Sequence, residues 1–162
     1  MKNIIIREIT EEDNLPLKKL IQNILEDFGL DIPGTAYFDP QLENLYGYYE
    51  QIENGNYWVA EKNGEVVGGI GIAPFNNQEK ICELQKLYVS SKVRGNGIGQ
   101  RLVEIALQFA AEHYEQCYLE THHKLVAAAK LYEKVGFTLL EAPLPGSEHS
   151  AMDMWYLKSF KE

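Results

Sequence analysis

Residues 84–112 read LQKLYVSSKVRGNGIGQRLVEIALQFAAE, and this stretch decides the fold. An apolar segment rich in β-forming residues leads into a glycine-rich turn. Apolar residues then recur at positions 98, 102, 105, 106 and 109, which is the spacing of one helical face. The stretch therefore predicts a strand, a tight turn and an amphipathic helix, in that order.

The predicted turn contains Gly95, Gly97 and Gly99. Glycine has no Cβ, so a ligand can approach the backbone closely and positive φ angles are accessible. The free N–H groups at the start of a helix, at the positive end of its dipole, bind phosphate or pyrophosphate. Arg94 adds a guanidinium that can hold phosphate oxygens through two parallel hydrogen bonds. Glycines that serve only close packing are the alternative at this point.

The composition fits one α/β domain covering residues 1–162, with 45% hydrophobic and 24% charged residues. A net charge of −9 argues against a non-specific nucleic-acid binder. It weakly favours cationic substrates, although solubility alone also explains it. Cys82 and Cys117 lack CxxC spacing and are expected in the core of a protein from a reducing compartment. With neither a signal pattern nor a long apolar run, we expect a cytoplasmic protein without a membrane partner.

Seven segments have the composition or alternation of strands, and four have helical periodicity. The expected strands are residues 3–7, 57–62, 65–73, 81–89, 116–121, 137–141 and 152–157. The expected helices are residues 10–28, 39–52, 98–112 and 122–135. Asn63-Gly64 lies between two of the strands and predicts a β-hairpin. Residues 75–80 are expected to form a polar turn.

The apolar alternation slips within the strand at 81–89. Leu84 lies in one phase, whereas Leu87 and Val89 lie in the other. A strand that buries both sets on one face must contain an extra residue, so we predict a β-bulge near Gln85 and Lys86. Such a bulge would free backbone groups at Leu87 and Val89 to bond a ligand.

A second motif follows the strand at 116–121. Leu119-Glu120-Thr121 precedes AAKLYEKVGF at residues 128–137. Together with Arg94-x-x-Gly97-x-Gly99 and the strand before it, this pattern resembles the GNAT family of acyl-CoA-dependent N-acetyltransferases. The resemblance runs along essentially the full chain, and it favours the phosphate-binding interpretation of the glycine turn.

The resemblance implies the α/β (α+β) GNAT fold. In this fold about four helices flank a mixed, mostly antiparallel sheet of about seven strands, and acetyl-CoA binds between the fourth and fifth strands. The pantetheine arm would pair with the bulged strand and the pyrophosphate would lie on the glycine-rich loop. The implied cofactor contacts are Leu87, Tyr88, Val89, Arg94, Gly95, Asn96, Gly97, Ile98, Gly99, Thr121 and Ala128.

The resemblance also implies how the chemistry is divided. Tyr132 matches the family's tyrosine acid, which reprotonates the leaving thiolate. We take Glu83 as the general base, acting directly or through water, with Glu120 and the pair His122-His123 as rivals. Because the two histidines lack a third ligand at helical spacing, we expect no metal site.

Leu125 departs from the family pattern, because many members carry asparagine seven residues before the tyrosine.

From the resemblance we expect an N-acetyltransferase that acts on an amine of a small molecule or peptide. A non-catalytic acyl-CoA-binding or regulatory module is the alternative. A dinucleotide-binding domain lacks its GxGxxG spacing here, and a P-loop NTPase lacks its Gly-Lys-Ser/Thr. Neither the acceptor nor the oligomeric state is decided by the sequence, and a homodimer stays open.

Overall fold

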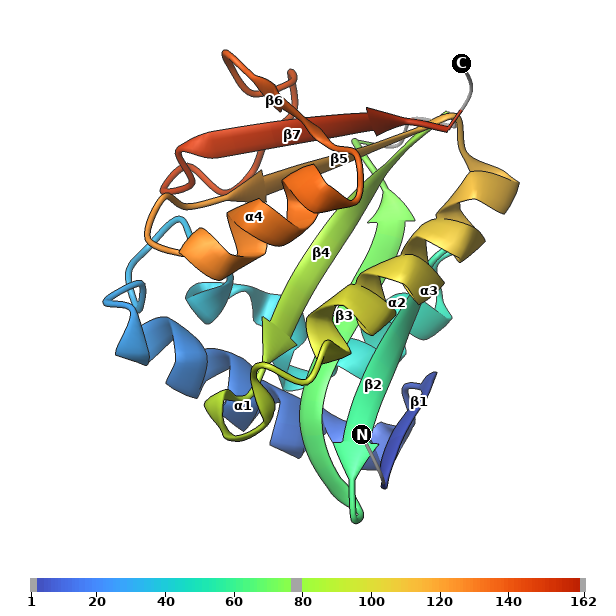
Figure 1. Cartoon of the computed structure of the whole chain (residues 1–162), viewed down its shortest axis with the longest axis vertical. Coiled ribbons are helices and arrows are strands. Elements are labelled where there is room, and N and C mark those ends of the chain that lie inside the picture. The colour runs from blue at the N-terminus through green and yellow to red at the C-terminus, as the bar shows by residue number, and fades with distance from the viewer. Residues whose placement is uncertain (1–2, 77–79, 161–162) are drawn as a thin grey trace.

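A seven-stranded sheet is the centre of the computed structural model, which describes residues 3–76 and 80–160 (Figure 1). The strands are β1 (Ile4–Glu8), β2 (Asn56–Lys62), β3 (Glu65–Pro74), β4 (Ile81–Val89), β5 (Gln116–Thr121), β6 (Thr138–Leu140) and β7 (Met154–Ser159). Their order is β1-β2-β3-β4-β5-β7-β6, and only β4 and β5 pair in parallel. The predicted mixed, mostly antiparallel sheet is confirmed.

Four α-helices cover the two faces of this sheet. They are α1 (Asn14–Asp27), α2 (Leu45–Glu50), α3 (Ile98–His113) and α4 (Val126–Lys134). Leu17, Ile21 and Leu25 of α1 pack with α2 on one face, whereas Leu102 and Ala106 of α3 pack on the other. Figure 1 shows α3 and α4 together in front of the sheet, with α1 and α2 behind it. The helical stripes in the sequence are the faces that these helices bury.

The Asn63-Gly64 turn joins β2 to β3 as predicted. Both residues have positive φ, at 52° and 82°, which is what the tight hairpin turn requires and what Asn-Gly tolerates best. The two strands pair along their length, so the hairpin prediction is confirmed. The predicted turn at residues 75–80 includes residues 77–79, which lie outside the described part of the chain.

The predicted bulge lies in β4. Gly69 pairs with Tyr88 and Gly71 pairs with Gln85, so two β4 residues lie opposite one β3 residue. Lys86 has a φ of 49°, a left-handed conformation that a lysine rarely adopts. The Tyr57 hydroxyl donates to the Lys86 carbonyl oxygen at 2.9 Å and holds the bulge in place. The phase slip in the sequence thus marks a real extra residue.

Beyond this bulge the sheet opens. The pairing between β4 and β5 covers three residues on each strand and ends at Glu83 and Tyr118. β5 pairs with β7 along its whole length, and β4 continues along β3 past the bulge. In Figure 1 the two strands diverge from their common end. The edge of β4 that faces β5 therefore has backbone groups to offer a ligand.

Several element boundaries differ from those predicted. The helix expected at residues 39–52 is a 3₁₀ turn, Pro40–Glu43, followed by the short α2, because the Asn44 side chain accepts from the Gly47 N–H and starts a new helix. The helix expected from His122 begins at Val126 instead. His122 accepts from the Lys124 N–H in a turn, which delays the helix.

Candidate active site

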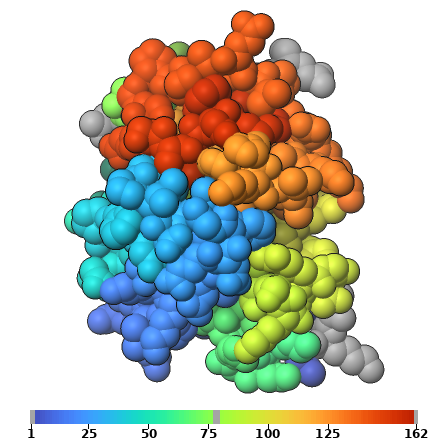
Figure 2. Space-filling model, turned by 90° about the vertical axis from the view of Figure 1, so that its left-hand side faces the viewer, coloured from blue at the N-terminus to red at the C-terminus, as the bar shows by residue number. Residues whose placement is uncertain are grey.

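A cavity of about 750 Å³ occupies the opening between β4 and β5. The end of α1, the second half of β4, the glycine-rich loop and α4 form its walls. In Figure 2 these segments converge on one face, α1 in blue, the loop in yellow-green and α4 in orange. The predicted residues that line the cavity are Leu87, Tyr88, Val89, Arg94, Gly95, Gly97, Ile98, Gly99, Thr121, Ala128 and Tyr132.

The glycines of the loop have two different roles. Gly95 and Gly97 have φ of 88° and 73°, and a Cβ at either position would meet nothing within 4 Å. Gly97 is the N-cap of α3, so the free N–H groups of the first turn begin directly after it. A Cβ at Gly99 would approach Leu131 Cδ2 to 3.3 Å, so this glycine lets α3 and α4 pack closely. The packing interpretation thus applies to Gly99, and the phosphate-binding interpretation of Gly95 and Gly97 stays a prediction.

Arg94 lies at the mouth of the cavity. Its guanidinium is 5.7 Å from the centre of the Phe28 ring, and its Nε donates to the Val89 carbonyl oxygen at 3.4 Å. Asn96 is not among the residues that line the cavity, because its amide turns back and donates to Val93 at 3.1 Å. The Asn96 side chain thus braces the loop, and a cofactor contact by its backbone stays a prediction.

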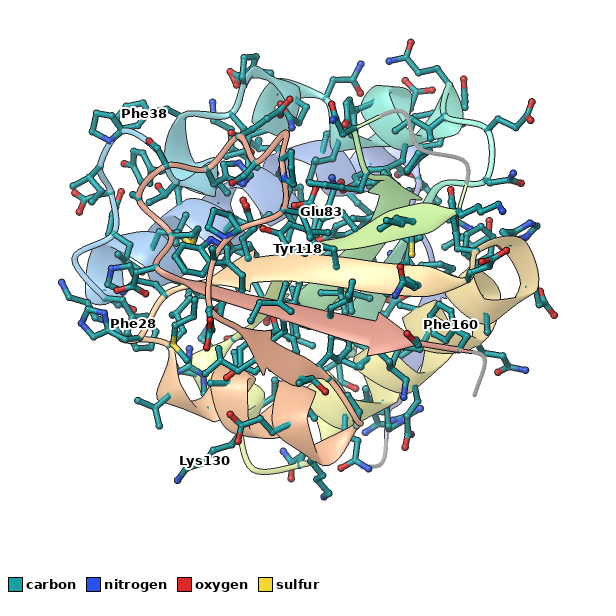
Figure 3. The ribbon with its side chains drawn as sticks, turned by 90° about the horizontal axis from the view of Figure 1, so that it is seen from above. Phe28, Phe38, Glu83, Tyr118, Lys130 and Phe160 are labelled. Carbon is teal, nitrogen blue, oxygen red and sulfur yellow. The ribbon has the colours of Figure 1, made fainter. Side chains whose placement is uncertain are left out.

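Three lysines at the cavity wall were not identified from the sequence. Lys124 lines the cavity from the turn before α4, and Lys130 and Lys134 line it from α4 itself. The stick view shows Lys130 directed away from the body of the molecule, on the side of α4 (Figure 3). The i, i+4 spacing of Lys130 and Lys134 places them on one helical face and could have suggested an anion-binding surface. With Arg94, these cations surround the mouth of an otherwise acidic protein.

Tyr132 is buried in the cavity wall, with 5% of its surface exposed. Its ring packs against Phe137 and Tyr156. Burial raises the pKa of the Tyr132 phenol above its ordinary value, and the nearby Cys117 and Tyr156 act in the same direction. The phenol therefore stays protonated across the physiological range, as a proton donor requires.

Glu83 lies on β4, before the bulge and next to the opening of the sheet. Burial raises the pKa of this carboxyl to about 7, a nearby negative charge on Glu120 adds to the effect, and a hydrogen bond from Gln85 opposes it. The Gln85 amide donates to the Glu83 carboxylate at 2.8 Å and Tyr49 in turn donates to Gln85 at 2.6 Å. Glu83 itself does not line the cavity, but Glu120 does. Figure 3 shows Glu83 beside Tyr118, near the middle of the molecule.

A chain of partly buried ionic contacts extends from the bulge to the loop between β6 and β7. Lys86 Nζ donates to Asp39 at 2.8 Å, and His149 Nε2 lies 2.9 Å from the same carboxylate. Asp39 precedes the 3₁₀ turn at Pro40, but its side chain makes no capping hydrogen bond there and contacts Lys86 and His149 instead. These contacts join positions 47 and 110 residues apart. No local pattern in the sequence could have paired them.

The histidine pair was set aside as a metal site because it lacked a third ligand along the chain. In space, Asp153 provides one, since ligand atoms of His122, His123 and Asp153 lie within 4.8 Å of one another. The Asp153 carboxylate accepts from the His123 backbone N–H at 2.9 Å and lies 2.5 Å from His123 Nδ1. These contacts hold the turn before α4 to the start of β7. The absence of a metal stays a prediction, but the reason given for it was wrong.

Leu125, where many relatives carry asparagine, also lines the cavity. Its backbone N–H donates to His122 and its carbonyl oxygen accepts from Ala129. Its side chain packs with the apolar cluster of α1 and α2. Leu125 therefore gives this part of the cavity wall an apolar side chain.

A second depression, of about 940 Å³, lies between α1 and the turn after β4. Its charged groups include Arg7 and Asp13, which pair with each other at 2.8 Å. Tyr132 and the glycine loop, which line the first cavity, are both absent from its described lining. Despite its larger volume, this depression lacks the groups that the chemistry needs.

Comparison with known proteins gives one consistent result. The model of the acetyltransferase (GNAT) family matches residues 20–137. The uncharacterized N-acetyltransferase YjgM of Escherichia coli strain K12 is 39% identical over 148 residues, which cover 90% of this chain and 88% of that protein.

Two solved structures share the fold over nearly the whole chain. The acetyltransferase of the GNAT family from Staphylococcus aureus Mu50 has a TM-score of 0.87 and 26% identity, over 98% of this chain and 99% of that one. The PaiA N-acetyltransferase from Thermoplasma acidophilum, solved in complex with coenzyme A, has a TM-score of 0.74 and 20% identity. That alignment covers 97% of this chain and 99% of the other. The second similarity bears on the fold alone.

Proposed function

This chain belongs to the acetyltransferase (GNAT) family, and from that premise we propose how its own residues carry out the transfer and which acceptors it takes. The protein is an N-acetyltransferase that uses acetyl-CoA as its acyl donor. We propose that the acceptor is an amino group of a small molecule or peptide. The observation that carries the site assignment is the cavity at the sheet opening, which joins the glycine loop, the bulged strand and Tyr132.

The residues around the cavity fit acetyl-CoA in three ways. The open space over Gly95 and Gly97 leaves room for phosphate oxygens beside the free N–H groups of α3. Arg94 and Lys130 supply positive charge at the same mouth. The unpaired edge of β4 at Leu87 and Val89 can bond the amide groups of the pantetheine arm, as an added strand would.

We assign the remaining predicted cofactor contacts to the walls of the same cleft. Tyr88 continues β4, Ile98 opens α3 beside Gly99, and Thr121 and Ala128 face them from β5 and α4. Asn96 keeps its place in the proposal through its backbone alone, since its side chain bonds Val93. Acetyl-CoA supplies an activated thioester, and the protein's part is to orient it and to manage protons.

Glu83 is the proposed general base. A base must be deprotonated when it accepts a proton and most effective near the working pH, and a pKa of about 7 meets both conditions. Because Glu83 lies just outside the cavity lining, it takes the proton through a water molecule. The N–H of Leu87, released by the bulge, is the proposed donor to the negative charge that develops on the thioester carbonyl oxygen.

Tyr132 is the proposed proton donor to the departing thiolate. Burial makes the phenol a weaker acid than usual, which by itself would slow the donation. The thiolate would depart into the same apolar wall, and burial raises the pKa of its conjugate thiol as well. The difference between the two pKa values, rather than either alone, decides whether the proton moves.

The proton balance assigns a residue to each transfer. An acceptor that arrives as an ammonium loses one proton to Glu83, then forms the C–N bond as the C–S bond breaks. The thiolate gains a proton from Tyr132, and the second proton that the nitrogen loses on becoming an amide restores the Tyr132 hydroxyl. Glu83 then returns its proton to solvent. One proton is released to solvent for each acetyl group transferred.

We also propose that residues 1–162 act as one domain and that the protein works in the cytoplasm. Every strand belongs to one sheet, and both apolar clusters pack against it. Cys82 and Cys117 are buried free thiols, which suits a reducing compartment. Among the described residues, no helix is long and apolar enough to span a membrane. We include neither a nucleic acid nor a membrane among the partners, and a homodimer stays open.

A paired assay tests the proposed function. Acetyl-CoA should raise the melting temperature, by an amount that corresponds to about 2.7 kcal/mol at one hundred times its dissociation constant. Thiol release from acetyl-CoA, measured with a panel of amines, should exceed the rate without amine. Stabilisation by acetyl-CoA without thiol release for any amine would instead favour a non-catalytic acyl-CoA-binding module.

A further inference from the structure

Five ionisable side chains gather where the loop between β6 and β7 covers the divergence of β4 and β5. Three are acidic and two are basic: Asp39, Glu83, Glu120, Lys86 and His149. Glu83 and Glu120 lie on neighbouring strands, and the charge of Glu120 contributes to the raised pKa of Glu83. This acidic excess adjoins the cavity, because Glu120 and Lys86 both line it.

Glu120 is the most unusual member of the group. Only 2% of its side chain is exposed. One carboxylate oxygen, Oε2, accepts from the Tyr118 hydroxyl at 2.9 Å and from the Ser147 hydroxyl. The other oxygen, Oε1, is buried and has no hydrogen-bond partner among the described residues. A buried carboxylate oxygen without a donor is costly, so the site is incomplete as it stands.

Both cations of the cluster contact the carboxylate of Asp39 instead of Glu120 Oε1. Lys86 pairs with Asp39 at 2.8 Å, and His149 Nε2 contacts the same carboxylate at 2.9 Å. The hydrogen bond to Asp39 raises the pKa of His149, while burial opposes this. The nearest described cation to Glu120 Oε1 is His149 Nδ1, at 3.9 Å, which is beyond hydrogen-bonding distance. Oε1 therefore receives no hydrogen bond from the described residues, although Glu120 lines the cavity.

We infer that Glu120 is the anchor for the acceptor's ammonium group, and that the enzyme takes aliphatic primary amines, which are protonated at neutral pH. This inference rests on the proposed function. An ammonium has three N–H donors. One can bond Oε1 of Glu120 while another faces the water through which Glu83 is proposed to take the proton. Arylamines are neutral at the same pH and bring no charge to the vacant position.

The arrangement gives the two glutamates separate tasks. Glu120 attracts the cation, and hydrogen bonds from Tyr118 and Ser147 hold its carboxylate in place. Glu83 takes the proton that the ammonium must lose before the nitrogen can attack. A nearby ammonium favours the charged form of Glu83, so acceptor binding itself lowers the pKa of Glu83 and prepares the base.

The test compares Glu120→Gln with wild-type enzyme on matched amines. Benzylamine and other aliphatic primary amines represent the protonated class, and aniline with its ring-substituted relatives represents the neutral class. We expect wild-type thiol release with aliphatic amines only. For the best of them, Glu120→Gln should raise KM by 10- to 100-fold, with a smaller change in kcat and no change in acetyl-CoA affinity. Glu112→Gln removes an equal charge from an exposed site on α3 and should behave as wild type.

A binding measurement keeps this inference separate from the proposed function. Calorimetry of the same amines with CoA-loaded enzyme should show aliphatic amine binding that Glu120→Gln weakens at least tenfold. Turnover of aliphatic amines with an unchanged KM in Glu120→Gln would overturn the inference and leave the function standing. Equal use of arylamines would also overturn it. Glu120-dependent binding without turnover would refute the function and support the anchor.

Discussion

The Glu83 carboxylate is held partly protonated at neutral pH by its surroundings. Burial raises its pKa to about 7, although a hydrogen bond from the Gln85 amide acts to lower this pKa. If Glu83 is the general base, kcat/KM should fall about tenfold for each pH unit below this pKa. Glu83→Gln should lower kcat/KM by roughly 10² to 10⁴ and abolish this acid limb. The measurement is kcat/KM between pH 5.5 and 9 for both enzymes. An acid limb that persists in Glu83→Gln would assign the base to another residue.

Tyr132 gives the second prediction for a single residue. Tyr132→Phe removes one buried hydroxyl oxygen and leaves the ring contacts with Phe137 and Tyr156 available. Loss of a general acid should lower turnover by roughly 10² to 10⁴. Acetyl-CoA affinity, measured by calorimetry, should change by less than threefold. Tyr37→Phe, which removes a hydroxyl from an exposed contact with Glu26, is the matched control. Unchanged turnover in Tyr132→Phe would remove this residue from the mechanism.

The residues that sequence reasoning found and missed differ in a physical way. Tyr132 and the glycines belong to compact motifs, where a spacing of a few residues carries the information. Lys86, Asp39 and His149 meet only after the sheet forms, across separations of 47 and 110 residues. Nothing in their local sequence distinguishes them from solvated charges. Such ionic contacts become visible only when the topology is known.

The glycine-rich loop is the element with the sharpest conformational demand. Gly97 ends the loop in a left-handed conformation, with a φ of 73°, and has open space around its Cα hydrogen. Gly97→Ala should therefore lower the free energy of unfolding by about 1 kcal/mol through backbone strain alone. It should also weaken acetyl-CoA binding, because the α3 N–H groups would be displaced. Gly97→Asn should cost less, since asparagine tolerates this conformation. Chemical denaturation measures the free energy of unfolding, and calorimetry measures acetyl-CoA binding. Equal losses of stability for Gly97→Ala and Gly97→Asn would indicate a steric cause instead of backbone strain.

At the scale of elements, the sequence predicted which segments form strands and helices better than where they begin. The slip of alternation in β4 located the bulge, because a strand's period of two leaves no other way to bury both sets of residues. The predicted starts of α2 and α4 were wrong, because the side chains of Asn44 and His122 bond nearby backbone N–H groups and compete with the helix. Capping and turn hydrogen bonds join residues that are close in sequence. Tertiary contacts decide which of the possible hydrogen bonds forms.

Across the whole molecule, the site lies at the junction of two halves of the sheet. The chain up to Val89 supplies β4 and the α1 wall, and the chain from Gln116 onward supplies β5, α4 and the covering loop. Figure 2 shows the blue and orange-red segments meeting along one side. The Ala151 N–H donates to the Gly34 carbonyl oxygen at 3.1 Å, and His149 contacts Asp39 close by. Folding must join these halves before the buried charges find their partners.

That burial leads to a prediction about the stability of the whole protein. In the folded state Glu83 has a pKa of about 7, against 4.5 in the unfolded chain. The folded state therefore binds more protons between these values, and the stability that this provides is fully present below pH 4.5 and lost as the pH rises through 7. The loss corresponds to about 3 kcal/mol for a difference of this size.

Glu83→Gln should remove this loss, because a neutral amide stays buried at every pH and its oxygen can still accept from Gln85. We expect the variant to be up to about 3 kcal/mol more stable than wild type at pH 8 and nearly equal to it at pH 4.5. Urea unfolding at a series of pH values measures this difference.

Asp13→Asn is a control in which the pH dependence of stability should have the opposite sign. Burial raises the Asp13 pKa, but hydrogen bonds from Arg7 and Thr10 outweigh it and lower the pKa overall. Its stabilisation is therefore present above the unfolded pKa and lost in acid. A Glu83→Gln protein that is less stable than wild type at pH 8 would show that the buried carboxylate contributes more through its contacts than it costs through its charge.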